Sequence, residues 1–195
     1  EGIAKPLIAR LALSESKVLG MAQGIRSVVA LPDPAGVRQS AMEIDDDLTV
    51  YRISCPIGVI GAIFESRPDA VPQISSLCLK SGNAVILKGG REAQNSNKVI
   101  VGLLTDAIKK VSGVPEAAVQ MIETRAEVAD MLKEEKYINL VVPRGSNDFV
   151  KYIQENTRIP VLGHSEGICH NYIDKDADLS KTLRIALDSK MQYPA

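Results

Sequence analysis

The sequence predicts an α/β fold, with a mainly parallel, doubly wound sheet preceded by N-terminal helices and a β-hairpin. From residue 56 onward, short apolar runs bounded by turn residues alternate with amphipathic segments, which is the order that builds βαβ units. Two of the runs, ending near Leu87 and Val142, are each followed by a basic residue, a glycine and a helical segment. Because parallel strands need crossover helices, we expect helices on both faces of the sheet.

The lead-in is predicted to be helical and then extended. Residues 5–31 have helical periodicity, and Ser14 is expected to cap the second of two helices. Residues 38–55 alternate loosely between apolar and polar side chains, which predicts a hairpin that turns at Asp45-Asp-Asp-Leu.

The rest of the chain is expected to alternate strands and helices. Asp69 is placed to cap the helix after the first strand, and Ser146 or Asn147 to cap the helix after the fourth. The predicted strands are residues 56–64, 83–87, 118–122, 138–142 and 168–173. The predicted helices are residues 69–79, 92–111, 126–133 and 148–156, with a last helix that starts at Asp178 or Ser180.

The composition excludes several classes of function. With 195 residues, the chain is long enough for one sizeable core. A net charge of −1 and the absence of Trp argue against a nucleic-acid surface. No apolar run approaches the roughly 20 residues of a membrane span. The three cysteines are an odd number without paired spacing, which favours a reducing compartment.

The junctions at the strand ends are the candidate sites. Lys88, Gly89 and Gly90 follow a buried strand and precede a helix, where free N–H groups and close backbone approach suit a phosphate. The same residues are also common in a plain turn, and they match neither the P-loop nor the G-x-G-x-x-G spacing. Glu65-Ser-Arg follows the first strand at the position where ligands of parallel sheets bind, although a capped turn with a surface ion pair explains it equally well.

Several stretches together resemble the aldehyde dehydrogenase superfamily. Pro56-Ile-Gly-Val-Ile-Gly is similar to the opening of its nucleotide domain, Ser81-Gly-Asn-Ala-Val-Ile-Leu-Lys to a strand of that domain, and Gly145-Ser to one of its turns. Within the superfamily, three motifs resemble the γ-glutamyl phosphate reductase family: Phe64-Glu-Ser-Arg-Pro-Asp, Leu87-Lys-Gly-Gly-Arg-Glu-Ala and Val142-Pro-Arg-Gly-Ser. The stretch Leu162-Gly-His-Ser-Glu-Gly-Ile-Cys-His is similar to the reductase domain fused to glutamate kinase in Δ1-pyrroline-5-carboxylate synthase.

The resemblance implies an activity and a cofactor. Members of this family reduce γ-glutamyl phosphate with NADPH to glutamate semialdehyde and release phosphate, as a step of proline synthesis. A cysteine thiolate attacks the acyl phosphate, and the resulting thioester is reduced. The implied fold is the Rossmann-like sheet of the aldehyde dehydrogenase type.

The resemblance also implies roles for single residues. Lys88 matches the lysine that reaches the adenosine ribose and its 2′-phosphate, which a flexible point charge suits. Gly89 and Gly90 would leave room for the adenosine end, and Gly145 with Ser146 would meet the pyrophosphate. Arg67 falls where aldehyde dehydrogenases carry an oxyanion-binding Asn, so it is expected to hold acyl-phosphate oxygens or the oxyanion.

Two departures from the superfamily's pattern matter. Aldehyde-oxidising members carry a water-activating Glu where this chain has Val161, which suits a reductase. The family's nucleophile follows a Lys-x-Gln-x-Pro segment, and here Lys190-Met-Gln-Tyr-Pro-Ala ends just before it. Because Cys55, Cys78 and Cys169 lie elsewhere, we expect no catalytic residue in this chain, a nucleophile soon after Ala195, and no metal site.

The chain is therefore expected to be a fragment. Residues 1–55 would form a lead-in that packs on the same domain, residues 56–195 would form the NADPH-binding domain, and a catalytic domain would lie beyond 195. The alternatives are a non-catalytic nucleotide-binding module and a fragment of an ordinary aldehyde dehydrogenase. Expected partners are the small-molecule substrate, a fused or associated glutamate kinase and, at full length, further copies in a homo-oligomer. A cytoplasmic location is expected, with a mitochondrial or plastid location left open.

Overall fold

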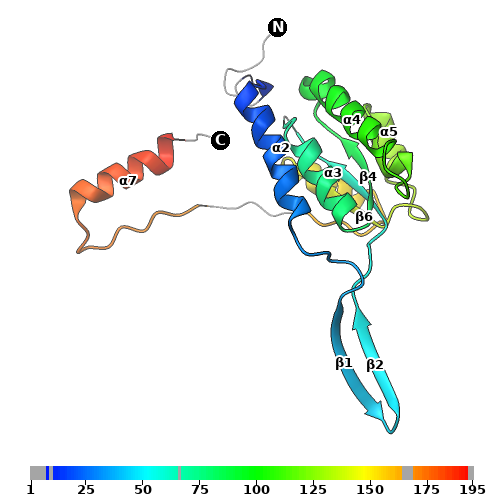
Figure 1. Ribbon diagram of the computed structural model, residues 1–195. Coiled ribbons are helices and arrows are strands. Elements are labelled where there is room, and N and C mark those ends of the chain that lie inside the picture. The colour runs from blue at the N-terminus through cyan, green and yellow to red at the C-terminus, as the bar shows by residue number, and fades with distance from the viewer. Residues whose placement is uncertain (1–7, 9–10, 66, 164–168, 193–195) are drawn as a thin grey trace. The chain divides into compact units, whose positions relative to one another are not determined.

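The computed structural model describes residues 8, 11–65, 67–163 and 169–192. The chain divides into two compact units, Glu1–His164 and Ser165–Ala195. Within the described residues, all strands belong to the first unit, and the second contains helix α7 (Leu179–Met191), which begins at the predicted cap Asp178 (Figure 1). No helix of the described residues is both long enough and apolar enough to cross a membrane.

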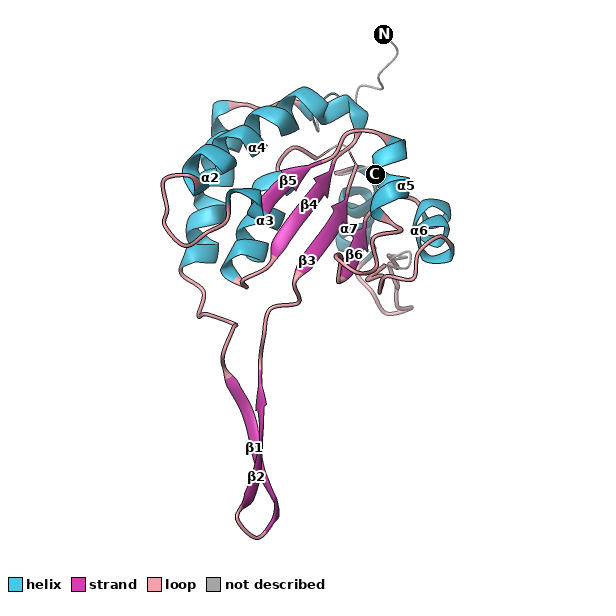
Figure 2. Cartoon of the chain, turned by 90° about the vertical axis from the view of Figure 1, so that its right-hand side faces the viewer, coloured by secondary structure: helices cyan, strands magenta, loops and turns pink. Residues whose placement is uncertain are grey.

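The first unit is built on a parallel sheet of four strands in the order β5-β4-β3-β6. Figure 2 shows the strands running side by side with helices around them. This arrangement confirms the predicted doubly wound α/β fold. The strands are β3 (Val59–Ile63), β4 (Ala84–Lys88), β5 (Val119–Met121) and β6 (Leu140–Pro143), and the helices after them are α3 (Ala70–Lys80), α4 (Gln94–Ile108), α5 (Arg125–Met131) and α6 (Asn147–Glu155).

The sheet has a separate apolar core on each face. Alternate residues of a strand point to opposite faces, so Ile60 and Ala62 of β3 pack with Val71 of α3, while Ile63 packs with Met131 of α5 and Ile153 of α6. Each fully buried aliphatic side chain of this kind contributes about 1.5–3 kcal/mol to folding. The two cores fix the positions of the strand ends at which the candidate site lies.

The turn before β4 depends on Gly82 and Asn83. Gly82 ends α3 with a φ of +72°, a conformation that glycine adopts without strain. Asn83 is only 5% exposed, and its side-chain oxygen accepts a hydrogen bond of 2.8 Å from the N–H of Gly58. This bond ties the start of β4 to the approach of β3, which helps to set the register of the two strands.

The lead-in contains helix α2 (Glu15–Val29) and the antiparallel strands β1 (Arg38–Asp45) and β2 (Leu48–Ile53). The hydroxyl of Ser14 accepts a bond of 3.3 Å from the N–H of Lys17, which confirms the predicted cap. The predicted hairpin turn is also confirmed, with Asp47 at a φ of 61°. Every residue of β1 and β2 is exposed.

Two local predictions are wrong. Asp69 precedes α3 with helical backbone angles and forms no side-chain cap bond, because a capping side chain needs an extended backbone at that position. Residues 169–173 form no strand, and Ile168 lies outside the described residues. In the described chain, Val161 forms an isolated bridge beside Val141 of β6. Residues 169–173 belong to the second unit, whose described residues contain no strand.

Cys78 belongs to the core on the α3 side of the sheet. It is 6% exposed, and burial raises the pKa of its thiol to about 11. Cys55 and Cys169 are exposed. Burial and a raised pKa both suppress thiol reactivity, so Cys78 has the properties of a structural core residue.

We therefore expect a thiol reagent at pH 8 to modify Cys55 and Cys169 quickly and to leave Cys78 unmodified until the protein unfolds. With a pKa of about 11, only about one Cys78 thiol in a thousand is ionised at that pH. Peptide mass mapping after native and denaturing labelling would measure this. Fast native labelling of Cys78 would contradict its burial in the core.

Candidate functional site

The carboxyl ends of three strands meet at one edge of the sheet. The register places Ile63 of β3 beside Lys88 of β4 on one side and Pro143 of β6 on the other. The pairing continues past the strand ends, because the N–H of Phe64 donates to the carbonyl of Lys88 (2.9 Å) and the N–H of Arg144 donates to that of Ile63 (2.7 Å). The junctions singled out in the sequence therefore lie next to one another.

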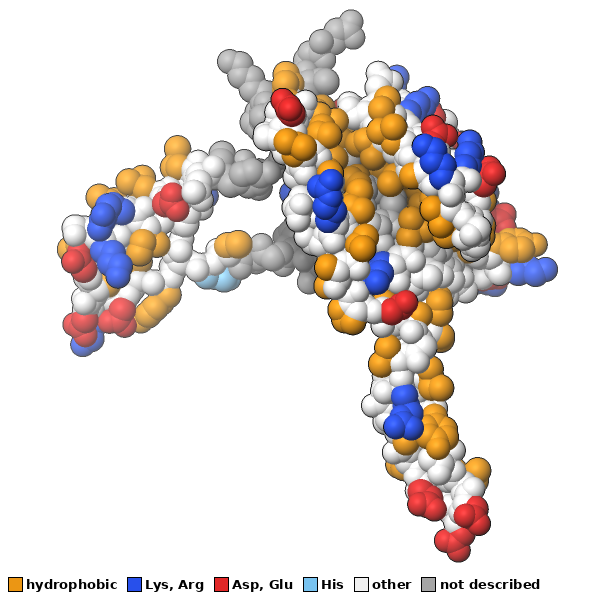
Figure 3. Space-filling view, viewed as in Figure 1, with side chains coloured by type: hydrophobic (Ala, Val, Ile, Leu, Met, Phe, Trp, Pro, Cys, Tyr) orange, Lys and Arg blue, Asp and Glu red, His pale blue; other side chains and the backbone are white. Residues whose placement is uncertain are grey.

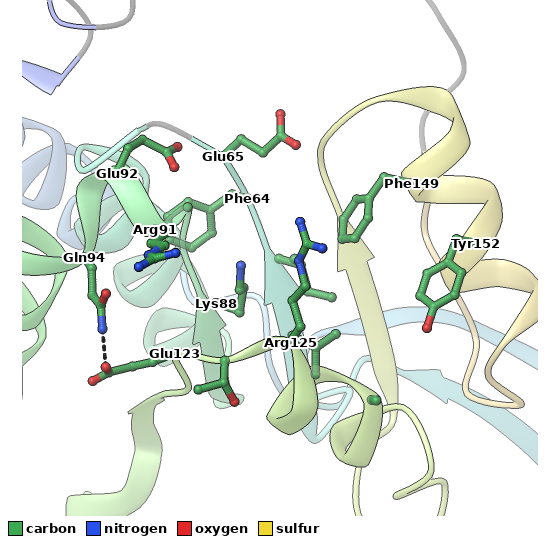
Figure 4. A pocket seen from close by; sticks show the side chains of 15 residues that line it. Phe64, Glu65, Lys88, Arg91, Glu92, Gln94, Glu123, Arg125, Phe149 and Tyr152 are labelled. Atoms are coloured by element: carbon green, nitrogen blue, oxygen red, sulfur yellow. Dashed lines mark hydrogen bonds between the residues drawn. The ribbon is translucent and has the colours of Figure 1, made fainter. Parts of the chain in front are cut away.

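A cleft of about 1240 Å³ opens at this edge. It is lined by the ends of β3 and β4, by the segment that joins β5 to α5, and by one face of α6. Its charged and aromatic lining consists of Phe64, Glu65, Lys88, Arg91, Glu92, Glu123, Arg125, Phe149 and Tyr152 (Figure 4). A cleft at the carboxyl ends of parallel strands is the usual ligand site of such sheets.

Lys88 and Gly90 line this cleft, as the predicted phosphate junction requires. Gly89 lies just behind them, and a Cβ added there would collide with the side-chain amide of Asn97, which is 1% exposed, and would lie 3.2 Å from the ring of Phe64. At Gly90, the atoms nearest to an added Cβ belong to the flexible end of Glu92. Gly89 thus has a packing requirement, and its role toward a ligand stays a prediction.

Gly145 and Ser146 lie where α6 begins. A Cβ on Gly145 would lie 3.0 Å from the ring of Phe149 and 3.1 Å from a carboxylate oxygen of Glu65, so the glycine borders the cleft through two of its lining residues. The hydroxyl of Ser146 caps α6 and accepts from the N–H of Phe149 at 3.4 Å. The cap is confirmed, and contact with a pyrophosphate stays a prediction.

Arg67 is not brought into the cleft. It is exposed and follows Ser66, which lies outside the described residues. Its backbone carbonyl accepts from the N–H of Ala70 at 3.1 Å, and its side chain is not part of the lining. The expected role toward the acyl phosphate therefore concerns a position next to this cleft and stays a prediction.

The structure adds cleft residues that the sequence reasoning missed. Arg91 and Arg125 line the cleft, and Phe149 and Tyr152 of α6 line its other side. Glu123 and Arg125 directly follow the predicted strand 118–122, so the rule that ligands bind beyond strand ends could have identified them. The two aromatic residues could have been found from their spacing of three on a helix that starts at a glycine turn.

The positive charges of the cleft remain without partners within the described chain. Figure 4 shows Lys88 between Arg91 and Arg125, and none of the three forms an ion pair with a described carboxylate. Glu123, in contrast, forms an ion pair of 2.8 Å with Lys98 and accepts a hydrogen bond from Gln94. Such an arrangement suits an anion with several oxygens.

The amides between β5 and α5 are already satisfied by the protein. Thr124 and Glu127 form a capping box, in which the Glu127 carboxylate accepts from the N–H groups of Glu123 (3.0 Å) and Thr124 (2.7 Å). The hydroxyl of Thr124 and these amides lower the pKa of Glu127. An anion in the cleft must therefore be held by side chains on this side rather than by these amides.

None of the three cysteines lines the cleft. Cys78 is in the core, and the other two belong to exposed segments. Val161, where aldehyde-oxidising relatives are expected to carry a Glu, is half-buried beside β6. Among the described residues, the cleft can therefore bind a ligand but has no thiol to attack one.

Known proteins resemble this chain over its whole length. It is 53% identical over 195 residues to the γ-glutamyl phosphate reductase of Acetivibrio thermocellus, a match that covers 100% of this chain and 45% of the relative. The γ-glutamyl phosphate reductase of Methanosarcina mazei is 54% identical over 193 residues, or 99% of this chain and 43% of the relative. The resemblance to the γ-glutamyl phosphate reductase family that the motifs indicated is confirmed.

Solved structures of related proteins have the same fold as this chain. The crystal structure of γ-glutamyl phosphate reductase from Thermotoga maritima matches 98% of this chain and 46% of its own, with a TM-score of 0.86 and 37% identity. The structure from Saccharomyces cerevisiae has a TM-score of 0.77 and 48% identity over 100% of this chain and 50% of its own. An acetylating aldehyde dehydrogenase from Geobacillus thermoglucosidasius, 20% identical over 95% of this chain and 41% of its own, shares the fold with a TM-score of 0.69.

The chain spans less than half the length of these curated relatives. A sequence model described as the aldehyde dehydrogenase family matches residues 9–193, which is nearly all of the chain. On the evidence of this match, of the shared fold and of the identity to the reductases, the chain belongs to the aldehyde dehydrogenase family.

Proposed function

We propose that the full-length protein reduces γ-glutamyl phosphate to glutamate semialdehyde with NADPH and releases phosphate, as a step of proline synthesis. The observation that carries this proposal is the 53% identity, over all 195 residues, to a protein named γ-glutamyl phosphate reductase. Bacterial and archaeal relatives support a cytoplasmic location. A glutamate kinase, fused or separate, would supply the acyl phosphate.

Membership in the aldehyde dehydrogenase family implies a nicotinamide cofactor, and the cleft fits one. The cations of its lining, Lys88, Arg91 and Arg125, suit phosphate groups. The rings of Phe149 and Tyr152 offer apolar surface to an adenine. We assign Lys88 to the ribose end and its 2′-phosphate, Gly89 and Gly90 to the loop that carries the lysine, and Gly145 with Ser146 to the pyrophosphate. When bound, the cofactor supplies the hydride.

The chemistry at the acyl group needs residues beyond this cleft. We propose that a cysteine outside residues 1–195 displaces phosphate to form a thioester, since none of Cys55, Cys78 and Cys169 lines the cleft. Arg67, exposed just after β3, is proposed to hold the acyl-phosphate oxygens or the oxyanion. The apolar Val161 in place of a water-activating carboxylate protects the thioester from hydrolysis.

We also propose that the full-length protein forms a homo-oligomer. The hairpin supports this, because Met42 and Val50 are paired directly across its strands and, like Ile44 and Leu48 nearby, are each about half exposed or more. Figure 3 shows apolar side chains along the hairpin and acidic ones at its turn. A two-stranded hairpin with such exposed apolar side chains is stabilised by further contacts.

The function is tested by the reverse reaction of the full-length protein. We expect NADP+ reduction with glutamate semialdehyde to require inorganic phosphate, because phosphate must release the acyl group from the cysteine. Absorbance at the NADPH band, with and without phosphate, measures this. Efficient oxidation of simple aldehydes in the absence of phosphate would instead support an ordinary aldehyde dehydrogenase.

Replacement of Lys88 by Met should weaken NADPH binding by roughly 10- to 100-fold, because a charge-assisted hydrogen bond to a phosphate is lost. NADH binding should change much less. Fluorescence titration of the full-length protein gives both Kd values. Lys110→Met, at an exposed lysine after α4, is the matched control. An equal loss for both nucleotides would remove Lys88 from the 2′-phosphate site.

Replacement of Arg67 by Ala should lower kcat by about 100-fold or more, as the loss of one oxyanion donor does in other enzymes. The Kd for NADPH should stay constant, since Arg67 does not line the cleft. Arg67→Lys should recover part of the rate because it retains the charge. Unchanged turnover by Arg67→Ala would rule out the proposed role.

A further inference from the structure

Glu123 is held by two side chains of α4, one of which lies outside the cleft. Its Oε1 lies 2.8 Å from the ammonium of Lys98, and its Oε2 accepts from the side-chain amide of Gln94. Gln94 and Lys98 are four residues apart in the first turns of α4, so they lie on one face of the helix. Glu123 and Gln94 line the cleft, whereas Lys98 does not. We call Gln94 and Lys98 the α4 clamp.

The clamp changes the charge balance of the cleft. Six charged residues line it, three cations and three carboxylates, so the lining is formally neutral. The clamp neutralises Glu123 with a charge that is not part of the lining. Figure 4 shows the Glu123 side chain extending to Gln94, away from Arg125 and Lys88. The cleft therefore retains an excess of positive charge beside the proposed ribose site.

Without the clamp, Glu123 would be free to act on the ligand. Its side chain is 33% exposed and already lines the cleft, so its release would leave an unpaired carboxylate at the cleft wall. A carboxylate there would compete with a phosphate for Arg125 and would repel it. It could also accept hydrogen bonds from ribose hydroxyls, which would favour a nucleotide without the phosphate.

We propose that the α4 clamp determines the preference of the cleft for a nucleotide that carries a phosphomonoester on its ribose. Lys98 is a positioning residue that acts through Glu123 from outside the cleft, and Gln94, at the cleft wall, holds the other oxygen of the same carboxylate. Arg91 and Arg125, on either side of Lys88, are the groups that the clamp leaves available to the phosphate. The inference rests on the proposed function, because it concerns the NADPH site of that proposal.

The test measures Kd for NADPH and for NADH by fluorescence titration of the full-length protein. In Lys98→Met, the NADPH Kd should rise roughly tenfold while the NADH Kd stays the same or falls, since a charge of about one unit is freed near the phosphate. Lys98→Arg should retain the wild-type ratio. Lys109→Met is the matched control, because Lys109 follows α4, has the same side-chain exposure of 50% and is also ion-paired, with Asp106.

A double variant shows whether Lys98 acts through Glu123 or contacts the phosphate directly. Lys98→Met with Glu123→Gln should regain NADPH binding, because a neutral Gln cannot repel the phosphate. If Lys98 touched the phosphate itself, the double variant would bind as weakly as the single one, and the proposal would be overturned. An unchanged ratio in Lys98→Met would also overturn it. A wild-type protein that binds NADH as tightly as NADPH would instead contradict the proposed function.

Discussion

The parallel register of β3 with its two neighbours is the constraint on which the site depends. It sets Ile63 beside both Lys88 and Pro143, so three chain segments leave the sheet at the same edge. The backbone bonds of Phe64 and Arg144 extend this alignment beyond the last paired residues. A shift of one residue would turn Lys88 to the other face of the sheet, and the two cores resist such a shift because both faces are buried.

Much of the fold could be predicted because the local sequence pattern and the packing of the folded chain favour the same elements. Buried strands such as residues 83–87 carry apolar runs between turn residues, and the Gly82 turn has the backbone conformation that glycine favours. The predicted strand 168–173 failed because its apolar composition is compatible with a strand but pairing depends on a neighbour. Val161 forms a single bridge beside Val141 of β6, and a pairing of one residue leaves no strand pattern in the sequence.

The site was predicted less completely for the same reason. Lys88 was identified because it lies in a motif, whereas Arg125 and Tyr152 become cleft residues only through the packing of α5 and α6 against the sheet. The ion pair of Glu123 is harder to infer from the sequence, since its partner Lys98 is 25 residues earlier and belongs to helix α4. Charge counts along a chain do not show which charges neutralise one another in space.

The close contact between Gly89 and Asn97 limits which substitutions each position can accept. Asn97 is almost fully buried with its side-chain oxygen unpaired, and its amide fills the space that any side chain at position 89 would need. A larger residue at 89 is tolerable only after position 97 has become smaller, and a smaller residue at 97 leaves a void until 89 has become larger. Each single step is costly, and only the joint change removes the collision with Asn97 without leaving a void. The two positions are therefore epistatic, and the loop that carries Lys88 can change in evolution only together with a helix position eight residues later.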